Sequence, residues 1–216
     1  MKRILLSVMC VVGMTWLAWA GDVNKELNSA ADLMKDMTSS NQIPTSLLEQ
    51  SKCIAVIPDV TKAGFGIGGK HGDGVVSCRT GQGWSAPAFL NLTGGSVGFQ
   101  AGVAKQDVIL LMNEQGAQQL REGHWDMGAE AVAAGPTGGA EASSATGWKA
   151  PVLSYTRSSG AYAGASLAGS KLSADDDMIR NQYGGSASFQ KVLDGQVQPN
   201  PSAKPFMSAL DQVAQK

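Results

Sequence analysis

Closely spaced glycines constrain the fold of this chain more than any other feature of its sequence. They begin at Gly64, after a stretch from residue 22 that contains none, and between Gly64 and Gly68 they alternate with apolar residues. Glycine inside a strand commonly marks tight curvature or a close approach of backbone. We therefore expect the middle of the chain to form a strongly curved, mainly antiparallel β-sheet, either a small barrel or a sheet folded over on itself.

Helical spacing of apolar residues flanks this region. It predicts an amphipathic helix over 23–37, a short one from Pro44 to Gln50, and further helices over 114–121 and 202–216. Short apolar segments bounded by glycine predict strands at 53–57, 64–69, 74–79, 95–104 and 108–112. The fold class is therefore α+β, a curved Gly-rich sheet or small barrel flanked by N-terminal and C-terminal amphipathic helices.

The first twenty residues have the three parts of a signal peptide. Lys2 and Arg3 precede an apolar run over 4–17, which is followed by the small-x-small ending of Ala18 and Ala20. The run is shorter than the roughly 18 to 20 residues that span a bilayer. We expect cleavage after Ala20 and a periplasmic or secreted product. Residues 21–216 would form one domain, with a helical segment (22–50), a β-rich core (51–198) and a C-terminal helix (202–216).

The charge and cysteine content of this product limit its partners. Removing Lys2 and Arg3 leaves 15 basic against 18 acidic residues, so the net charge falls to −3 and gives no general attraction to nucleic acid or anionic membranes. Any contact with an anion must therefore be local. No nucleic-acid partner is expected. Cys53 and Cys78 are the two cysteines that remain. Because an even pair in an oxidising compartment more often bridges than stays free, we expect a disulfide between them.

The sequence contains no convincing catalytic or cofactor motif. Residues 64–69 match the dinucleotide pattern G-x-G-x-x-G, and residues 64–70 match most of the phosphate-loop pattern, but His71 stands where that loop needs Ser or Thr. A turn and another strand are expected to follow instead of a helix. No nucleophile lies in an elbow motif. We therefore expect a protein that is not an enzyme and has no cofactor.

Two His-x-Asp triplets are the main candidate metal ligands. His71 with Asp73 and His124 with Asp126 supply imidazole and carboxylate groups suited to a divalent metal, and would serve a metal hydrolase. The alternative is that both triplets lie in exposed turns, which their surroundings favour. The acidic run at 175–177 lacks the spacing of a calcium loop and is better explained as a helix N-terminal cap.

Several ordered blocks resemble one known family. They lie at 55–58, 62–69, 72–76, 84–87, 95–102, 135–136, 155–164 and 183–184, across nearly all of the expected mature chain. Together they resemble the SYLF domain family, also called the Ysc84 actin-binding domain, and the chain looks like a bacterial exported member. The resemblance implies a lipid-binding module without enzyme activity. Eukaryotic members bind phosphoinositides and remodel membranes, and some bind actin, which is not expected in a bacterial periplasm.

The resemblance directs attention to residues that can meet a phospholipid headgroup, including a phosphoinositide-type headgroup, at a membrane surface. The N-terminal helix offers apolar residues and cations, and the glycine-rich segment offers further lysines. The candidates are Lys25, Leu27, Met34, Lys35, Lys62 and Lys70. Two alternatives remain open: the apolar face of the helix packs on the sheet, or the domain is a periplasmic scaffold that binds an envelope protein and no lipid.

Overall fold

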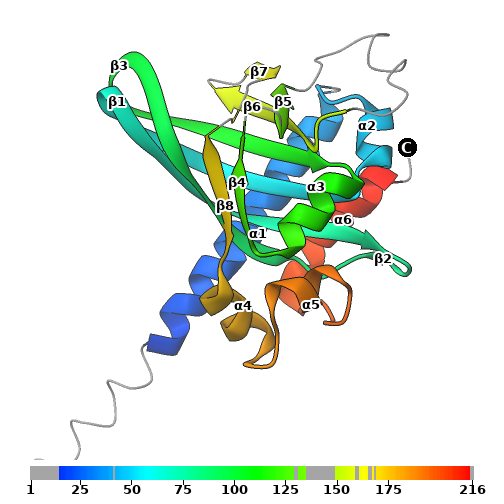
Figure 1. Ribbon diagram of the computed structural model, residues 1–216. Coiled ribbons are helices and arrows are strands. Elements are labelled where there is room, and N and C mark those ends of the chain that lie inside the picture. The colour runs from blue at the N-terminus through cyan, green and yellow to red at the C-terminus, as the bar shows by residue number, and fades with distance from the viewer. Residues whose placement is uncertain are drawn as a thin grey trace, which may run out of the picture.

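The computed structural model describes residues 15–40, 42–128, 131–134, 149–158, 161–164, 167 and 169–214. Its described strands form one eight-stranded sheet, and its helices lie before the first strand, between strands and at the C-terminal end (Figure 1). The basic start of the expected signal peptide lies outside the described residues. No helix in the described ranges has the length and apolar character needed to cross a bilayer.

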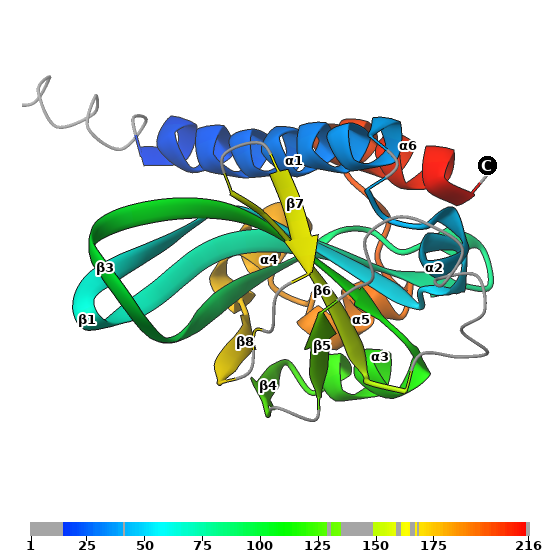
Figure 2. The same cartoon turned by 90° about the horizontal axis from the view of Figure 1, so that it is seen from above.

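Two very long strands organise the sheet. Strand β1 (Cys53–Thr80) pairs antiparallel with β3 (Ala88–Met112) along almost its full length, from Cys53 opposite Met112 to Val76 opposite Ala88. The five strands expected at 53–112 are therefore segments of only two. Both strands bend sharply near their middles, so that the two-stranded ribbon folds back over itself (Figure 2). The expectation of a folded-over antiparallel sheet is confirmed.

Glycine makes both the bend and the contact between the folded halves possible. A Cβ atom on Gly64 would lie only 2.4 Å from the Cα atom of Gly68, so the chain turns too tightly there for a larger residue. Beyond the bend, a Cβ atom on Gly74 would lie 2.6 Å from the backbone oxygen of Val56 in the other half. The two halves of β1 therefore pack face to face with backbone against backbone.

The remaining strands extend each half of the ribbon. In the half that contains the start of β1, β6 (Val152–Ser158) pairs with β3. Strands β5 (Val132–Ala134) and β7 (Ala161–Gly164) in turn pair with β6. The second half is joined by β8 (Ser170–Ala174) and then β4 (His124–Met127). Strand β2 (Gly83–Trp84) closes the hairpin after β1. We call the half that contains the start of β1, with β6, β5 and β7, the helix-covered half. The half that contains the end of β1, with β8 and β4, is the open half.

Burial along β1 shows why these names apply. In the helix-covered half, Ile54 and Val56 on one face and Ala55 and Ile57 on the other are all fully buried, so both faces are covered. Helices α1 (Thr15–Ser39) and α6 (Lys204–Ala214) form the layer over the outer face (Figure 2). In the open half, buried and exposed residues alternate over 70–74, as in a strand with one face in water.

Shorter helices close the two ends of the sheet. Helix α2 (Thr45–Gln50) leads into β1, and α3 (Glu114–Arg121) follows β3, as the sequence predicted for both. Helix α4 (Asp176–Tyr183) begins after Asp175, whose side chain accepts a hydrogen bond from the Met178 backbone N–H. The acidic run is thus a helix cap, as expected. Helix α5 (Phe189–Leu193) and the 3-10 turn η2 (Pro201–Ala203) lead to α6.

Candidate functional site

The bend of the ribbon carries both exposed apolar residues and lysines. We define the ribbon tip as residues 60–70 of β1 and 94–106 of β3, two segments that carry three lysines and no acidic residue. Among the described side chains, Ile67 and Val103 are the exposed large hydrophobic ones, at 80% and 72% exposure. Both belong to the tip. Exposed apolar groups and lysines therefore occur together here.

Two of the tip lysines point inside the fold. Val60 contacts the position that a Cβ atom on Gly72 would occupy, so both residues face the interior between the halves. Lys62 lies two residues from Val60 along β1, and Lys70 lies two residues from Gly72, so both lysines share that inner face. Lys70 is only 8% exposed. Its burial, and secondly the positive charge of Lys62, lower the pKa of the Lys70 ammonium group.

The third tip lysine lies on the outside. Lys105 neighbours Gln106 along β3 and therefore points to the opposite face of the strand. Its Nζ lies 3.4 Å from an Asp59 carboxylate oxygen, and both side chains are well exposed. An exposed pair of this kind contributes only about 0–1 kcal/mol to stability. Lys105 therefore remains available to other anions.

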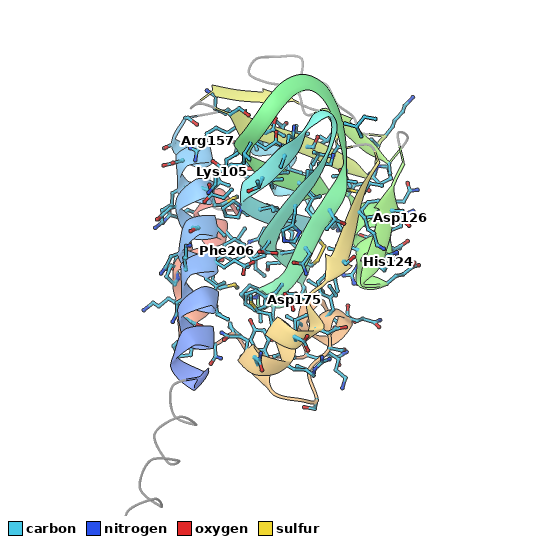
Figure 3. The ribbon with its side chains drawn as sticks, turned by 90° about the vertical axis from the view of Figure 1, so that its left-hand side faces the viewer. Lys105, His124, Asp126, Arg157, Asp175 and Phe206 are labelled. Carbon is cyan, nitrogen blue, oxygen red and sulfur yellow. A yellow bond between two sulfur atoms is a disulfide. The ribbon has the colours of Figure 1, made fainter. Side chains whose placement is uncertain are left out.

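The candidate lipid residues of the N-terminal helix occupy a different place. Leu27 and Met34 are fully buried in the core beneath α1. Lys25 and Lys35 are exposed, and Lys35 lies 3.5 Å from Asp32 on the same helix. Figure 3 shows α1 running along one side of the ribbon. Lys25 and Lys35 belong to this helix, whereas the inner pair at the tip lies on the face of β1 between the two halves. In this structure the apolar face of α1 packs on the sheet.

An ion-pair cluster attaches the C-terminal part of α1 to the sheet. Arg157 Nε on β6 donates to Asp107 Oδ2 on β3 (2.8 Å), its Nη2 lies 2.7 Å from the same oxygen, and its Nη1 lies 3.1 Å from Asp36 on α1. The second Asp107 oxygen accepts the backbone N–H of Asp59, at 3.0 Å. Charge-assisted contacts of this kind are stronger than hydrogen bonds between neutral groups. It holds the helix on the sheet.

The two His-x-Asp triplets do not come together. His71 and Asp73 lie in β1, and His124 and Asp126 lie in β4, so the expectation that both occupy turns is wrong. Each triplet forms its own close contact, at 3.3 Å and 3.6 Å respectively. Strands β3 and β8 run between them, so the pairs are roughly 14 Å apart at the usual strand spacing.

His71 and Asp73 are strand residues because β1 continues without a break. Gly72 is needed on the inner face, where the other half of the ribbon touches it, and its neighbours therefore point outward into water. Within the described residues, no group of three or more His, Cys, Asp or Glu side chains is arranged to hold a metal ion. The His and Asp residues of both triplets are therefore exposed surface groups of the open half.

The expected disulfide is present. Cys53 and Cys78, at the two ends of β1, are bonded with their Cα atoms 4.0 Å apart. The Arg79 backbone N–H also donates to the Lys52 carbonyl at 2.7 Å. These links join the two ends of β1 to each other, at the end of the folded ribbon opposite its tip. They leave the bend with its lysines unlinked.

Sequence comparisons relate this architecture to known proteins. A family model described as Ysc84, Las17-binding protein actin regulator, matches residues 93–213, which is more than half of the chain. The chain belongs to the Ysc84 family. The segment matched by the family model includes the β3 side of the ribbon tip together with β8 and α6.

Curated relatives extend the similarity to most of the chain. Protein YSC84 of Saccharomyces cerevisiae is 32% identical over 203 residues, covering 88% of this chain and 43% of that protein. SH3 domain-containing protein PJ696.02 of Schizosaccharomyces pombe is 36% identical, covering 87% and 45%. The human SH3 domain-containing YSC84-like protein 1 is 28% identical, covering 90% and 60%. The chain thus spans about half the length of these relatives. No solved structure matches it.

Sequence reasoning found Lys62 and Lys70 but missed other residues at the tip. Ile67 and Val103 were assigned to strands without being recognised as exposed. Gln106 and Ser170, which are buried polar residues on β3 and β8, were not singled out. Alternation along each strand separates its two faces, but only the register between strands shows which face of β3 and β8 lies opposite the lysines.

Proposed function

We propose that this Ysc84-family domain binds the surface of a phospholipid membrane through its ribbon tip. The observation that carries the proposal is the exposure of Ile67 and Val103 at 80% and 72% in a tip that has lysines and no acidic residue. Apolar side chains that enter the headgroup boundary, accompanied by cations that attract anionic lipid, are the two elements of interfacial membrane binding. The tip presents both.

The expected strength is modest. Full burial of Ile67 and Val103 contributes about 1.5–3 kcal/mol each. A lysine close to an anionic surface adds about 1 kcal/mol, and this part is screened by salt. Because association also has an entropic cost, these terms describe reversible attachment rather than permanent anchoring. Binding should therefore depend on both the anionic lipid content and the ionic strength.

The tip is a better candidate than the N-terminal helix. For α1 to insert its apolar face, Leu27 and Met34 would have to leave the core, at about 2 kcal/mol for each side chain. The contacts of Arg157 with Asp36 would also break. Ile67 and Val103 are exposed already and need no rearrangement.

The proposal assigns no reaction to the domain and places it outside the inner membrane. The family description names a binding protein and regulator, which supports a binding role. The proposed periplasmic or secreted location depends on the basic, apolar and small-x-small order of residues 1–20. In that location actin is not a proposed partner, although the family description names an actin regulator.

Co-sedimentation with vesicles tests this role. The chain 21–216 would be mixed with phosphatidylcholine vesicles, with and without phosphatidylglycerol. The variant I67D/V103D should lose most of the bound fraction, because it replaces the inserting groups with charges that anionic lipid repels. The control Q118D/Q190D adds the same charge at exposed positions on α3 and α5 and should bind like the wild type. Wild-type protein that binds neither vesicle, or equal binding by I67D/V103D, would overturn the proposal.

A second candidate function is supported by the open half of the sheet. Its outer face presents a polar surface across β1, β3, β8 and β4, on which His71, Asp73, His124 and Asp126 are exposed. Such a face suits an envelope protein partner. Substituting Asp73 and Asp126 with Lys should abolish capture of that partner from envelope extracts and leave vesicle binding unchanged. Capture that survives this change and fails in I67D/V103D would assign the partner to the tip instead.

A further inference from the structure

The inner face of the bend collects hydrogen-bond donors from three strands. Lys62 and Lys70 lie on that face of β1, as their spacing from Val60 and Gly72 shows. Gln106 pairs directly with Val60 across β1 and β3, and directly opposed residues of an antiparallel pair point to the same face. Gln106 is therefore the diagonal neighbour of Lys62, roughly 7 Å away and within reach of long side chains.

Ser170 reaches the same face from β8. It pairs with Gly94, which in turn pairs with Lys70, so the three residues form one row across β8, β3 and β1. A Cβ atom on Gly94 would lie 2.7 Å from the Cε atom of Lys70 and 3.0 Å from the Cα atom of Ser170. The Lys70 side chain thus lies over Gly94 toward Ser170, in space that any larger residue at 94 would fill.

Two members of this set are buried without a partner. Gln106 is 8% exposed and Ser170 is 2% exposed. Among the described residues, neither the Gln106 Nε2 nor the Ser170 Oγ has a hydrogen-bond partner. Buried polar side chains are paired in the large majority of cases, so each exception calls for a ligand or another explanation. We call Lys62, Lys70, Gln106 and Ser170 the donor cluster.

The donor cluster lacks an anionic acceptor of its own. Neither segment of the ribbon tip contains Asp or Glu, and no salt bridge involves Lys62 or Lys70 among the described residues. Two ammonium groups, an amide N–H₂ and a hydroxyl call for an anion with several oxygen atoms. A carboxylate would leave one of the two positive charges uncompensated. A phosphate monoester carries about −1.5 to −2 charge at neutral pH and three terminal oxygens, so it matches both requirements.

We infer that the donor cluster binds a phosphate monoester group at the inner face of the bend. Lys62 and Lys70 neutralise its charge, while Gln106 Nε2 and Ser170 Oγ donate to its oxygens. The same chemistry is offered by a free phosphate compound and by a lipid headgroup such as that of phosphatidic acid. The lipid form of this inference rests on the proposed membrane function; the binding of soluble phosphate does not.

Calorimetric titration of the chain 21–216 with inorganic phosphate tests the cluster directly, with acetate as the comparison anion. Phosphate should bind more tightly than acetate. K70M and S170A should each weaken phosphate binding, K70M on the order of tenfold or more, the loss expected for one charge-assisted hydrogen bond. The matched control K204M removes an exposed lysine of α6, outside the tip, and should leave the affinity unchanged. S170A deletes a single oxygen, so it separates loss of the ligand contact from loss of folding.

The outcomes separate this inference from the membrane proposal. Equal affinity for phosphate and acetate, an adventitious ion only, or equal losses in K204M and K70M would overturn the inference. For the lipid source, vesicles containing phosphatidic acid should bind better than vesicles containing phosphatidylglycerol, and K70M should remove this preference. If the protein binds vesicles without this preference and does not bind phosphate, the inference is overturned and the membrane role is retained. Phosphate binding without vesicle binding retains the inference and overturns the membrane role.

Discussion

Cys53 and Cys78 lie 25 residues apart in sequence, at opposite ends of one strand, yet their Cα atoms are 4.0 Å apart. A straight strand of that length would separate its ends by roughly 80 Å. The disulfide therefore records the folding of β1 back on itself and closes the ribbon at the end away from its tip. Its sulfur atoms connect the two halves covalently.

Replacing this disulfide should lower the free energy of unfolding. In the variant C53A/C78A we expect a loss of about 3 kcal/mol, because the unfolded chain regains the freedom of the closed loop. Urea denaturation followed by circular dichroism measures the change. Reductant should destabilise the wild type and have no effect on the variant. Thiol titration of the denatured, unreduced wild type should detect neither Cys53 nor Cys78; two titratable thiols would contradict the pairing.

The contact between the ribbon halves predicts a sharp difference between two glycines. G74A should destabilise the protein by about 1–3 kcal/mol, since its new Cβ atom would lie 2.6 Å from the Val56 oxygen and the halves would have to separate. G81A is the matched control, because nothing lies within 4 Å of its added Cβ atom. Urea midpoints of the two variants provide the comparison. Equal effects would show that the halves do not touch as described.

The attachment of α1 depends on Arg157. R157L should lower stability by about 2 kcal/mol, because it leaves the partly buried Asp107 without its charged partner. Amide hydrogen exchange should increase in the C-terminal turns of α1, near Asp36. R180L removes an exposed pair with Asp177 and should change stability by less than about 1 kcal/mol. Unchanged exchange in α1 would show that the helix is held by apolar packing alone.

Burial of Lys70 predicts a pH-dependent stability. Its pKa is lowered from the ordinary 10.5, to which it returns on unfolding. Between these two values the unfolded chain binds more protons than the folded one, so stability rises with pH through that interval. At pH values below this interval Lys70 is charged in both states, so the whole cost of burying its charge lowers the stability of the fold. K70M should therefore be more stable than the wild type at neutral pH in phosphate-free buffer, and the difference should shrink as the pH approaches 10.5. A difference that does not vary with pH would contradict this assignment.

Cleavage after Ala20 is a prediction from the sequence. N-terminal sequencing of the exported protein should begin at Gly21, and the double variant A18L/A20L should accumulate as the longer precursor, because the cleavage site requires small residues. W19L changes only the middle position and should be processed normally. Among the described side chains, the buried face of α1 begins at Val23, so cleavage would leave that packing intact. An unprocessed wild-type chain would contradict the expectation.

Local signals in the sequence located most helices accurately. The predicted helix over 114–121 coincides with α3, where Asn113 caps the first turn by accepting the Gly116 backbone N–H at 3.0 Å. The helix predicted from Pro44 to Gln50 corresponds to α2, and Asp175 caps α4 as expected. These features depend on residues a few positions apart, so inspection of one short segment is enough to find them.

Strand boundaries were predicted less well because glycine has two roles in this chain. Residues 71–73 were interpreted as a turn, since glycine flanked by polar residues usually marks one. In the structure Gly72 lies within β1, where the absence of a side chain lets Val60 of the other half approach. A single sequence cannot distinguish a glycine that breaks a strand from one that admits a distant backbone.

The amino-acid sequence alone determined that the chain has helical ends, a curved glycine-rich middle, a disulfide-forming pair of cysteines and a place in the Ysc84 family. Those properties follow from periodicity, composition and short motifs. The tertiary structure alone decided that Leu27 and Met34 are buried, and that Lys62 and Lys70 share the inner face of the bend with Gln106 and Ser170. The physical reason is that a lysine faces the core or solvent according to strand register, and register arises from pairing between segments distant in sequence.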